Sequence, residues 1–337
     1  MKSVAFYSYK GGSGRSTACV NFTYFFAKDV NATVDNPIII VDCDIDSAGL
    51  TYLLQKNCKN RDKFVSTPGN KIFSVESILC GDQKGNDGVS KIRGLESYPP
   101  LVSIHDNPFF TDMIPVGDFF GLEPETVLFL PSDLKSRDGN FNASPSRKAN
   151  YIQIKKMARR YKCSGLIFDC PAGTQELALW SLESVDNIVC CMRPTYQFRC
   201  GSVDSIKIVI DKTEEGEEKR IIICPNAVSR KNTTFYGSKY PESIRSRLKE
   251  EVFDVVDKYC KNTGKDEEIQ IVDSMLYNSP VESVNKRSEN IKGADLIGIP
   301  EVERFKWFEE CLGTIKIENE DEELAIERYK YLVSLVQ

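Results

Sequence analysis

A glycine-rich segment near the start of the chain constrains the fold more than any other feature. Residues 9–17 read YKGGSGRST, an apolar run at 4–7 precedes them, and a stretch with helical character at 18–28 follows. A strand, a glycine-rich turn and a helix in this order let backbone N–H groups wrap a phosphate chain at the N-terminus of the helix. The segment therefore predicts a nucleotide-binding α/β protein.

The small and hydroxyl-bearing residues of this segment suit a nucleotide phosphate chain with Mg²⁺. Gly11, Gly12 and Gly14 allow the backbone to approach phosphate closely and to adopt positive φ angles. Ser16 is placed to bind Mg²⁺ through its hydroxyl, and Thr17 adds a second hydroxyl at the start of the helix. These residues predict a phosphate-binding P-loop.

Two positions depart from a standard P-loop. Arg15 stands where such a loop has lysine, and Tyr9 stands where it has its first glycine. Arginine keeps the positive charge but presents a planar fork instead of a compact ammonium group. We interpret Arg15 as a phosphate clamp, and a site that binds nucleotide without useful turnover is the alternative. The segment by itself is also compatible with an ordinary glycine turn beside a basic residue.

The apolar runs predict a parallel sheet. They are continuous instead of alternating, which is typical of strands that helices cover on both faces. We expect strands at residues 4–7, 38–41, 127–130, 166–168, 187–192 and 221–224, and helices at 18–28, 150–162 and 322–337. The fold class is α/β, with a mostly parallel central sheet flanked by helices on both faces.

The chain contains neither an internal repeat nor a low-complexity linker, so we interpret residues 1–337 as a single domain. Residues 57–125 have no clear period and contain several Gly, Pro, Asn and Asp clusters, so we expect a loop-rich insertion there, of unknown role. Residues 132–149 also have the composition of a loop.

Acidic residues follow two of the expected strands. Asp42 and Asp44 come after the run at 38–41, and Asp169 comes after the run at 166–168, with Gly173 four residues further on. Ligands bind at the carboxyl ends of strands in such sheets. A carboxylate there can hold an attacking water or reach Mg²⁺ through water, and Gly173 offers an N–H group near a terminal phosphate. Each acid alone could instead be a turn residue or a helix cap.

Together these motifs resemble the ParA/MinD-type ATPases, which have a deviant Walker A motif, and in particular the subgroup whose loop reads KGGVGR. The resemblance is carried by KGGSGRS at 10–16, VDCDIDSAGL at 41–50 and FDCPAG at 168–173, the family's second switch. It covers residues 1–55 and 125–229 well and the C-terminal part loosely, but not the stretch between. Ser13 stands where the subgroup usually has valine.

The resemblance implies a role for each matching residue. Lys10 would reach the phosphates of the partner subunit across a nucleotide-sandwich homodimer, with Arg15 acting within its own subunit. Asp44 would position the attacking water, with Lys10, Arg15 and Asp44 as the catalytic set. The implied metal residues are Ser16, Asp44 and Asp169, partly through water, and the implied switch residues are Asp42, Asp169 and Gly173. The implied nucleotide-binding residues are Gly11, Gly12, Ser13, Gly14, Arg15, Ser16, Thr17, Pro225 and Asn226.

Pro225 and Asn226 are expected to lie against the adenine ring, and Asn21 also matches the family pattern. The expected function is that of a Mg²⁺-dependent, slowly hydrolysing ATP switch that forms a homodimer and regulates a partner protein or complex. The alternatives are a non-hydrolysing nucleotide-dependent scaffold and a fold-related ATP-dependent transferase.

Composition narrows the set of partners. The formal net charge of −5 gives no global attraction to nucleic acid or to an anionic membrane. The basic segment 147–162 is better explained as a solvated helix face than as a nucleic-acid site. The C-terminal helix follows an acidic stretch, which predicts packing on the domain and no membrane contact. Twelve cysteines without a C-x-x-C motif, a single histidine and no signal peptide favour a reduced, cytoplasmic protein without a zinc site.

Overall fold

The central element of the molecule is an eight-stranded sheet with strand order β3-β4-β2-β5-β1-β6-β7-β8. The computed structural model describes residues 1–57, 61–64, 72–80, 104–133, 145–228, 239–274, 298–306 and 310–337. The strands are β1 (Lys2–Tyr7), β2 (Ile38–Asp42), β3 (Ile114–Pro115), β4 (Val127–Leu130), β5 (Gly165–Asp169), β6 (Asn187–Met192), β7 (Lys219–Pro225) and β8 (Ile269–Asp273). All neighbouring strands are parallel except β3 and β4, so the predicted fold class is confirmed.

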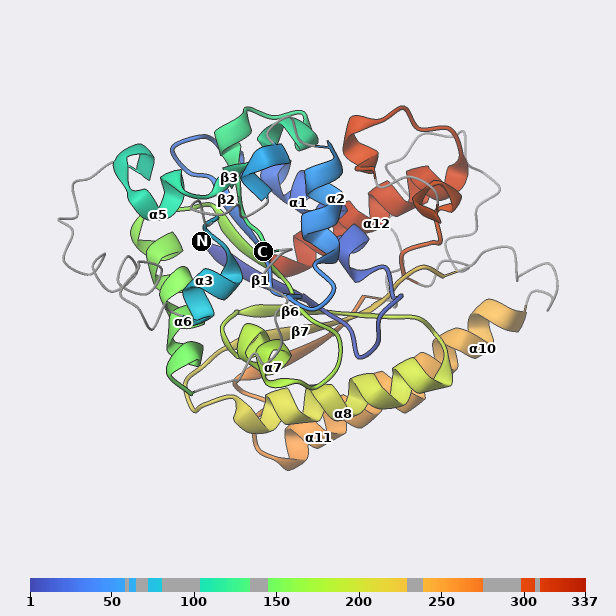
Figure 1. Ribbon diagram of the computed structural model, residues 1–337. Helices are drawn as coiled ribbons and strands as arrows, with labels where there is room; N and C mark the ends of the chain where they lie inside the picture. The colour runs from blue at the N-terminus through green and yellow to red at the C-terminus, as the bar shows by residue number, and fades with distance from the viewer. Residues whose placement is uncertain are drawn as a thin grey trace.

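Helices cover both faces of this sheet (Figure 1). The α-helices are α1 (Arg15–Asp29), α2 (Gly49–Asn57), α3 (Val75–Cys80), α5 (Pro108–Thr111), α6 (Pro145–Arg160), α7 (Glu176–Glu183), α8 (Tyr196–Lys212), α10 (Lys239–Leu248), α11 (Asp254–Asn262) and α12 (Glu320–Val336). Five residues of π-helix, Lys249–Phe253, join α10 to α11. The 3₁₀ helices are Arg61–Phe64, Ile104–Asp106, Gly117–Phe120, Pro124–Thr126, Glu303–Lys306 and Leu312–Thr314.

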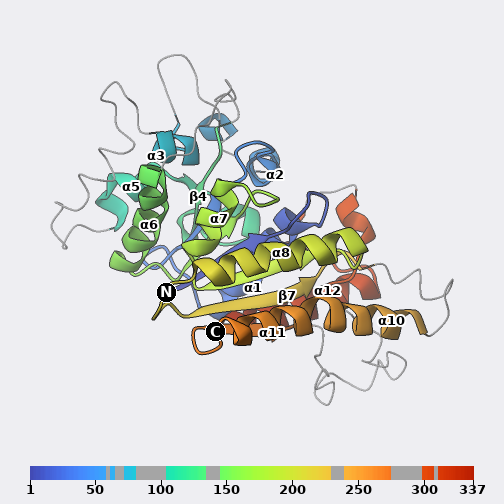
Figure 2. The same ribbon diagram turned by 90° about the horizontal axis from the view of Figure 1, so that it is seen from below.

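The core has two layers, one on each side of the sheet. Alternate residues of β1 show this division: Val4 and Phe6 pack with α1, α2 and α12, whereas Ala5 and Tyr7 pack with α6, α7 and α8. The helices α8 and α11 contact each other, and Figure 2 shows them on either side of β7 in that view. Because both faces of the central strands are buried, their sequences are continuously apolar, as the parallel sheet requires.

All six predicted strands are present, and two further strands were not predicted. β3 is only two residues long, and it pairs antiparallel with β4. β8 lies at the sheet edge and reads IQIVD, with the Gln270 side chain exposed. Neither strand has the continuous apolar run of a strand covered on both faces, which explains why the sequence pattern did not reveal them.

The predicted helices exist, and all three begin earlier than expected, α12 by two residues at Glu320. α1 begins at Arg15, inside the glycine-rich segment, and α6 begins at Pro145. The prediction of a loop at 132–149 is therefore wrong for residues 145–149. Proline suits the first turn of a helix because it needs no N–H partner there, and the polar residues after it have no apolar period to reveal the helix.

The C-terminal helix packs on the domain, as expected. α12 lies along α1, and its side chains Tyr329, Leu332, Val333 and Val336 are buried. In the part of the chain that the structure describes, no helix is long and apolar enough to cross a membrane.

The described parts of residues 57–125 also join the core. Phe64, Phe109 and Phe120 are buried, and β3 extends the central sheet. The rest of that stretch lies outside the described residues, and so does most of the loop predicted at 132–149.

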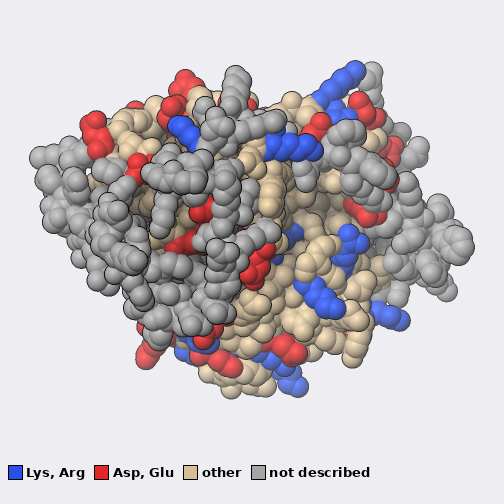
Figure 3. All heavy atoms as spheres, in the orientation of Figure 1, with Lys and Arg blue, Asp and Glu red and all other residues tan. Residues whose placement is uncertain are grey.

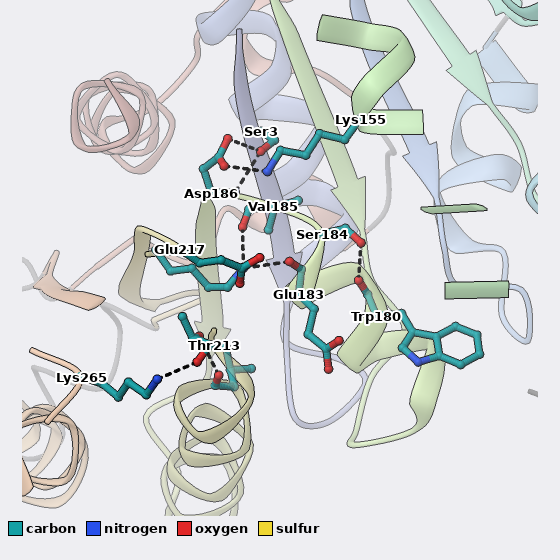
Figure 4. A network of polar contacts seen from close by, with 12 residues as sticks. Ser3, Lys155, Trp180, Glu183, Ser184, Val185, Asp186, Thr213, Glu217 and Lys265 are labelled. Carbon is teal, nitrogen blue, oxygen red and sulfur yellow. Dashed lines mark hydrogen bonds and ion pairs between the residues drawn. The ribbon is translucent and has the colours of Figure 1, made fainter. Parts of the chain in front are cut away.

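Two basic side chains of α6 are held by a polar network beside the N-terminal ends of the central strands β1 and β6 (Figure 4). Lys155 Nζ lies 2.6 Å from Asp186 Oδ1, and Arg159 lies 3.3 Å from the same oxygen. The Ser3 hydroxyl donates to Asp186 Oδ2 over 2.6 Å. Nearby, Lys219 Nζ donates to the carbonyl oxygens of Glu183 and Val185, at the end of α7. This network commits two of the cations that segment 147–162 would otherwise offer to a ligand.

We predict that Asp186→Asn lowers the free energy of unfolding more at neutral pH than at pH 3. Burial raises the pKa of the Asp186 carboxyl, but Lys155, Ser3 and Arg159 together lower it below its ordinary value of 3.8. A lowered folded-state pKa stabilises the fold above the unfolded-state pKa, and this contribution disappears as the pH falls through the folded-state value. Urea unfolding at a series of pH values measures the difference.

Asp204→Asn, which removes an exposed carboxylate from α8, is the matched control and should change stability by about 0.5 kcal/mol or less. An Asp186→Asn effect that is equal at pH 7 and pH 3 would contradict the prediction.

Candidate nucleotide site

The glycine-rich segment forms an open turn between the end of β1 and the start of α1. Gly12 and Gly14 have φ angles of 78° and 76°, a conformation that residues with a Cβ rarely adopt. Gly11 and Gly12 are exposed, and a Cβ on either would meet no atom within 4 Å. The space above the turn is therefore free for a ligand.

Two side chains from neighbouring strands hold the carbonyl groups of this turn. Asn226, just after β7, donates its amide Nδ2 to the carbonyl oxygens of Ser13 (2.9 Å) and Gly14 (3.1 Å). Arg193, just after β6, donates Nε to the carbonyl of Gly12 over 2.7 Å. The peptide bonds are trans, so each fixed carbonyl turns the following N–H group to the opposite side.

The N-terminus of α1 adds further N–H donors. The first backbone bond of the helix runs from the Ala18 N–H group to the Gly14 carbonyl over 2.9 Å. The N–H groups of Arg15, Ser16 and Thr17 come before it, so the helix itself supplies no acceptor for them. Backbone donors that converge in this way form an anion site, and the partial positive charge of the helix N-terminus strengthens it.

Arg15 lies between the two predicted acidic motifs. Its Nη2 is 2.8 Å from Asp44 Oδ2, and its Nε is 2.7 Å from Asp169 Oδ1. The Arg15 and Asp44 side chains are 8% and 10% exposed, and that of Asp169 is fully buried. The structure thus brings together three of the predicted site residues, from α1, from the segment after β2 and from the end of β5.

Burial and neighbouring charges shift the pKa values of Arg15 and Asp169 in opposite directions. Burial lowers the pKa of Arg15, but the charges of Asp169 and Asp44 outweigh it and raise that pKa above its ordinary value. Burial raises the pKa of Asp169, and the Arg15 charge only partly opposes this. The guanidinium is therefore firmly cationic and compensates carboxylates that have lost most of their hydration.

Asp42 has a different environment from the other two acids. Its Oδ2 accepts hydrogen bonds from the Thr51 backbone (2.8 Å) and hydroxyl (2.7 Å), and its Oδ1 accepts one from the Asp44 N–H group (3.1 Å). Burial, and then the charge of Asp169, raise the pKa of Asp42 to about 8, although the Thr51 bonds lower it. Asp42 thus shapes the turn that carries Asp44, and its predicted switch role stays a prediction.

Gly173 is fastened to the strand that precedes the glycine-rich turn. It has a φ of 87°, its N–H group donates to the Ser8 carbonyl (3.2 Å), and its carbonyl accepts from the Tyr7 hydroxyl (2.9 Å). Its N–H group is thus bound to protein here, whereas the sequence suggested a contact with phosphate. The switch role of Gly173 remains a prediction that would require this hydrogen bond to break.

Lys10 lies at the exposed end of the loop. Its Nζ donates to the side-chain oxygen of Gln197 at the start of α8 over 2.8 Å, and it forms no ion pair with any described residue. The side chain is therefore free of a charged partner within the described part of its own subunit, which its predicted role across a dimer needs.

The residues expected against adenine are engaged with protein. Asn226 holds the glycine-rich turn, and the Pro225 carbonyl accepts a hydrogen bond from the Ile299 N–H group over 2.9 Å. Asn21 links α1 to the 3₁₀ helix Leu312–Thr314, because it donates to the Thr17 carbonyl and accepts from the Leu312 N–H group. The position of an adenine ring stays a prediction.

Mg²⁺ fits the residues present, provided that a nucleotide supplies most of its ligands. Within the described residues there is no group of three or more His, Cys, Asp or Glu side chains that could hold a metal ion. Asp169 Oδ2 is buried without a hydrogen-bond partner, so it can accept from a metal-bound water. Ser16 supplies a hydroxyl, and phosphate oxygens and water would complete the octahedral set that Mg²⁺ prefers.

The sequence did not reveal Arg193, Gln197 or Thr51. Arg193 and Gln197 follow β6, which is the neighbour of β1 in the sheet, so only the strand order shows that they lie beside the loop. An arginine directly after an apolar run was the available signal for Arg193.

These features define a P-loop NTPase fold with a candidate nucleotide site. No family model matches the sequence, and no curated protein does either. Solved structures do match: apo McdA from Cyanothece has a TM-score of 0.57 at 14% identity, covering 100% of this chain and 99% of McdA. A putative plasmid partition protein from Borrelia burgdorferi, bound to AMPPNP, has a TM-score of 0.50 at 12% identity, covering 99% of this chain and 97% of its own. The fold is that of the ParA/MinD-type P-loop ATPases.

We predict that Arg15→Met lowers the free energy of unfolding by about 3–5 kcal/mol, since it leaves two buried carboxylates without their cation. Arg15→Lys should lower the free energy of unfolding by less, because lysine keeps the positive charge. Some loss should remain, because an ammonium group cannot donate from two separate positions of a planar fork. Urea denaturation without nucleotide measures both losses. Arg193→Met, at a more accessible arginine beside the same loop, is the control, with an expected loss of about 1 kcal/mol or less. A variant Arg15→Met as stable as wild type would contradict the ion-pair account.

Proposed function

We propose that this chain binds ATP with Mg²⁺ at the 10–17 loop, hydrolyses it slowly and acts as a dimerising switch on a partner protein. The observation that carries the proposal is the placement of Arg15. A single guanidinium at the phosphate loop contacts both acidic residues that follow β2 and β5. The nucleotide site and the two candidate switch segments are therefore connected by one side chain.

This connection gives nucleotide a way to act on distant surfaces. A phosphate that draws Arg15 towards the loop weakens its bonds to Asp44 and Asp169. The segments after these acids can then take another arrangement, because a ligand shifts a conformational equilibrium by its different affinity for the two states. Ordering of such segments by a terminal phosphate and Mg²⁺ is a recurring switch mechanism.

The solved structures support the nucleotide part of the proposal. One is an ATP complex of a McdA variant, with a TM-score of 0.52 at 14% identity, covering 100% of this chain and 96% of its own, and the Borrelia structure holds AMPPNP. Those ligands belong to those proteins. For this chain, ATP, the homodimer, a cytoplasmic location and a protein partner remain our proposals, as does membership of the KGGVGR subgroup.

Dimerisation gives the first test. Size measurement by light scattering should show a larger species with ATP and Mg²⁺ than with ADP or without nucleotide. Lys10→Ala should weaken the ATP-dependent dimer, because the exposed Lys10 ammonium would no longer reach the partner's phosphates. Lys56→Ala, which removes a lysine from the last turn of α2, is the control and should dimerise like wild type. If the Lys10 variant dimerises and hydrolyses ATP like wild type, the role of Lys10 across the dimer is wrong.

Hydrolysis separates the switch from a non-hydrolysing scaffold. The scaffold is favoured by one observation: Arg15 already engages Asp44 Oδ2, the oxygen that would position the attacking water. We expect wild type to release phosphate faster than Asp44→Asn, which keeps the shape of the side chain but is a weaker base. Equal release rates, with ATP affinity retained in both proteins, would support the scaffold.

A further inference from the structure

The proposed function leaves a charge deficit at the loop. A nucleoside triphosphate is a polyanion, and a P-loop must supply a cation to neutralise it. Arg15 cannot do this alone, because its single positive charge is shared by the two carboxylates of Asp44 and Asp169. Lys10 is exposed and is assigned to the partner's phosphates. Another cation within the subunit would add to the positive charge that Mg²⁺ brings to the phosphates.

Arg193 is the described side chain that meets this requirement. It lies directly after β6, whose neighbour β1 leads into the loop, and its Nε bonds the Gly12 carbonyl over 2.7 Å. It forms no ion pair with any described residue, in contrast to Arg15, so no carboxylate in the described part of the chain compensates its charge. A guanidinium has five N–H donors, and the Gly12 carbonyl uses one of them.

Other basic side chains lie near Arg193 and the glycine-rich turn. Figure 3 shows Lys and Arg side chains gathered between α2 and α8, in the region where Figure 1 places the turn between β1 and α1. Low-dielectric walls around like charges concentrate the electrostatic potential at such a site. A Cβ on Gly11 or Gly12 would meet no atom within 4 Å, and the half-buried Arg193 lies beside this open part of the turn through its bond to the Gly12 carbonyl.

Resting on the proposed function, we propose that Arg193 is a phosphate-binding residue that neutralises the triphosphate from within the same subunit. In the absence of nucleotide its Nε holds the Gly12 carbonyl. With nucleotide it donates its remaining N–H groups to phosphate oxygen, in charge-assisted hydrogen bonds. Arg15 then serves to couple the loop to the acids, and Arg193 adds its positive charge to that of Mg²⁺.

A purely loop-holding role for Arg193 is distinguishable by substitution. Arg193→Gln keeps a side-chain N–H donor for the Gly12 carbonyl but removes the charge. Arg193→Lys keeps the charge and can reach phosphate as a single ammonium. Arg159→Ala is the control, because Arg159 lies beside Asp186 at the N-terminal ends of the strands, opposite to the end that carries the loop. Calorimetric titration of each variant with ATP, ADP and AMP in the presence of Mg²⁺ gives the dissociation constants.

We expect Arg193→Ala to weaken ATP binding about tenfold or more, since hydrogen bonds to charged groups contribute strongly. AMP binding should weaken less than about threefold, because fewer phosphate charges are present. Lysine should restore ATP affinity better than glutamine, and Arg159→Ala should bind like wild type.

The negative outcomes separate the two proposals. If wild type binds no ATP, the proposed function fails. If wild type binds ATP and Arg193→Ala binds it equally well, the phosphate-binding role of Arg193 fails while the proposed function stands. The role would also be overturned if Arg193→Ala lost affinity equally for ATP, ADP and AMP and Arg193→Gln bound all three like wild type. Arg193 would then be a residue that only holds the loop.

Discussion

The ion-paired group of Arg15, Asp44 and Asp169 is the interaction on which the geometry of the site depends. It joins the first residue of α1 to the segments that follow two adjacent strands, β2 and β5. All three side chains are nearly or fully buried, so each charge has lost most of its hydration and is stabilised by the others. Removal of any one member would leave a buried charge uncompensated. The position of α1, the phosphate loop and the acidic turns are therefore interdependent.

The shape of the loop has a second origin, in side chains that come from outside it. Asn226 and Arg193 hold consecutive carbonyl groups on one side, so the intervening N–H groups are directed to the other. Tyr9 stands where a standard loop has its first glycine, and it packs against α8: a Cβ on Gly201 would lie 2.0 Å from the Tyr9 ring. The loop thus keeps an open phosphate cradle although its sequence departs from the usual motif at two positions.

The sequence was sufficient to predict the sheet and the end of it at which the candidate site residues gather, because both depend on local patterns. Continuous apolar runs located six strands, and acids or glycines directly after three of them indicated the ligand-binding edge. What could not be predicted depends on contacts between distant residues. Nothing near Arg15 in sequence shows that its partners are Asp44 and Asp169, and Asn226 donates to carbonyls more than 200 residues earlier, at Ser13 and Gly14. The short β3 and the half-exposed β8 have no local apolar signal.

This geometry suits an arginine at position 15 better than a lysine. Nε and Nη2 belong to one rigid plane and donate to two different carboxylates at the same time, whereas an ammonium is a single point charge. Two acids held by one plane respond together when that plane moves. In the proposed function, a phosphate that competes for the guanidinium then changes the segments after β2 and β5 in one step. Such coupling has a consequence for charge: an arginine used to hold two acids contributes little positive charge to the ligand. In the proposed function, neutralisation of the phosphates then depends on Mg²⁺ and on other cations around the loop, and Arg193, which bonds the Gly12 carbonyl, is the cation that we propose.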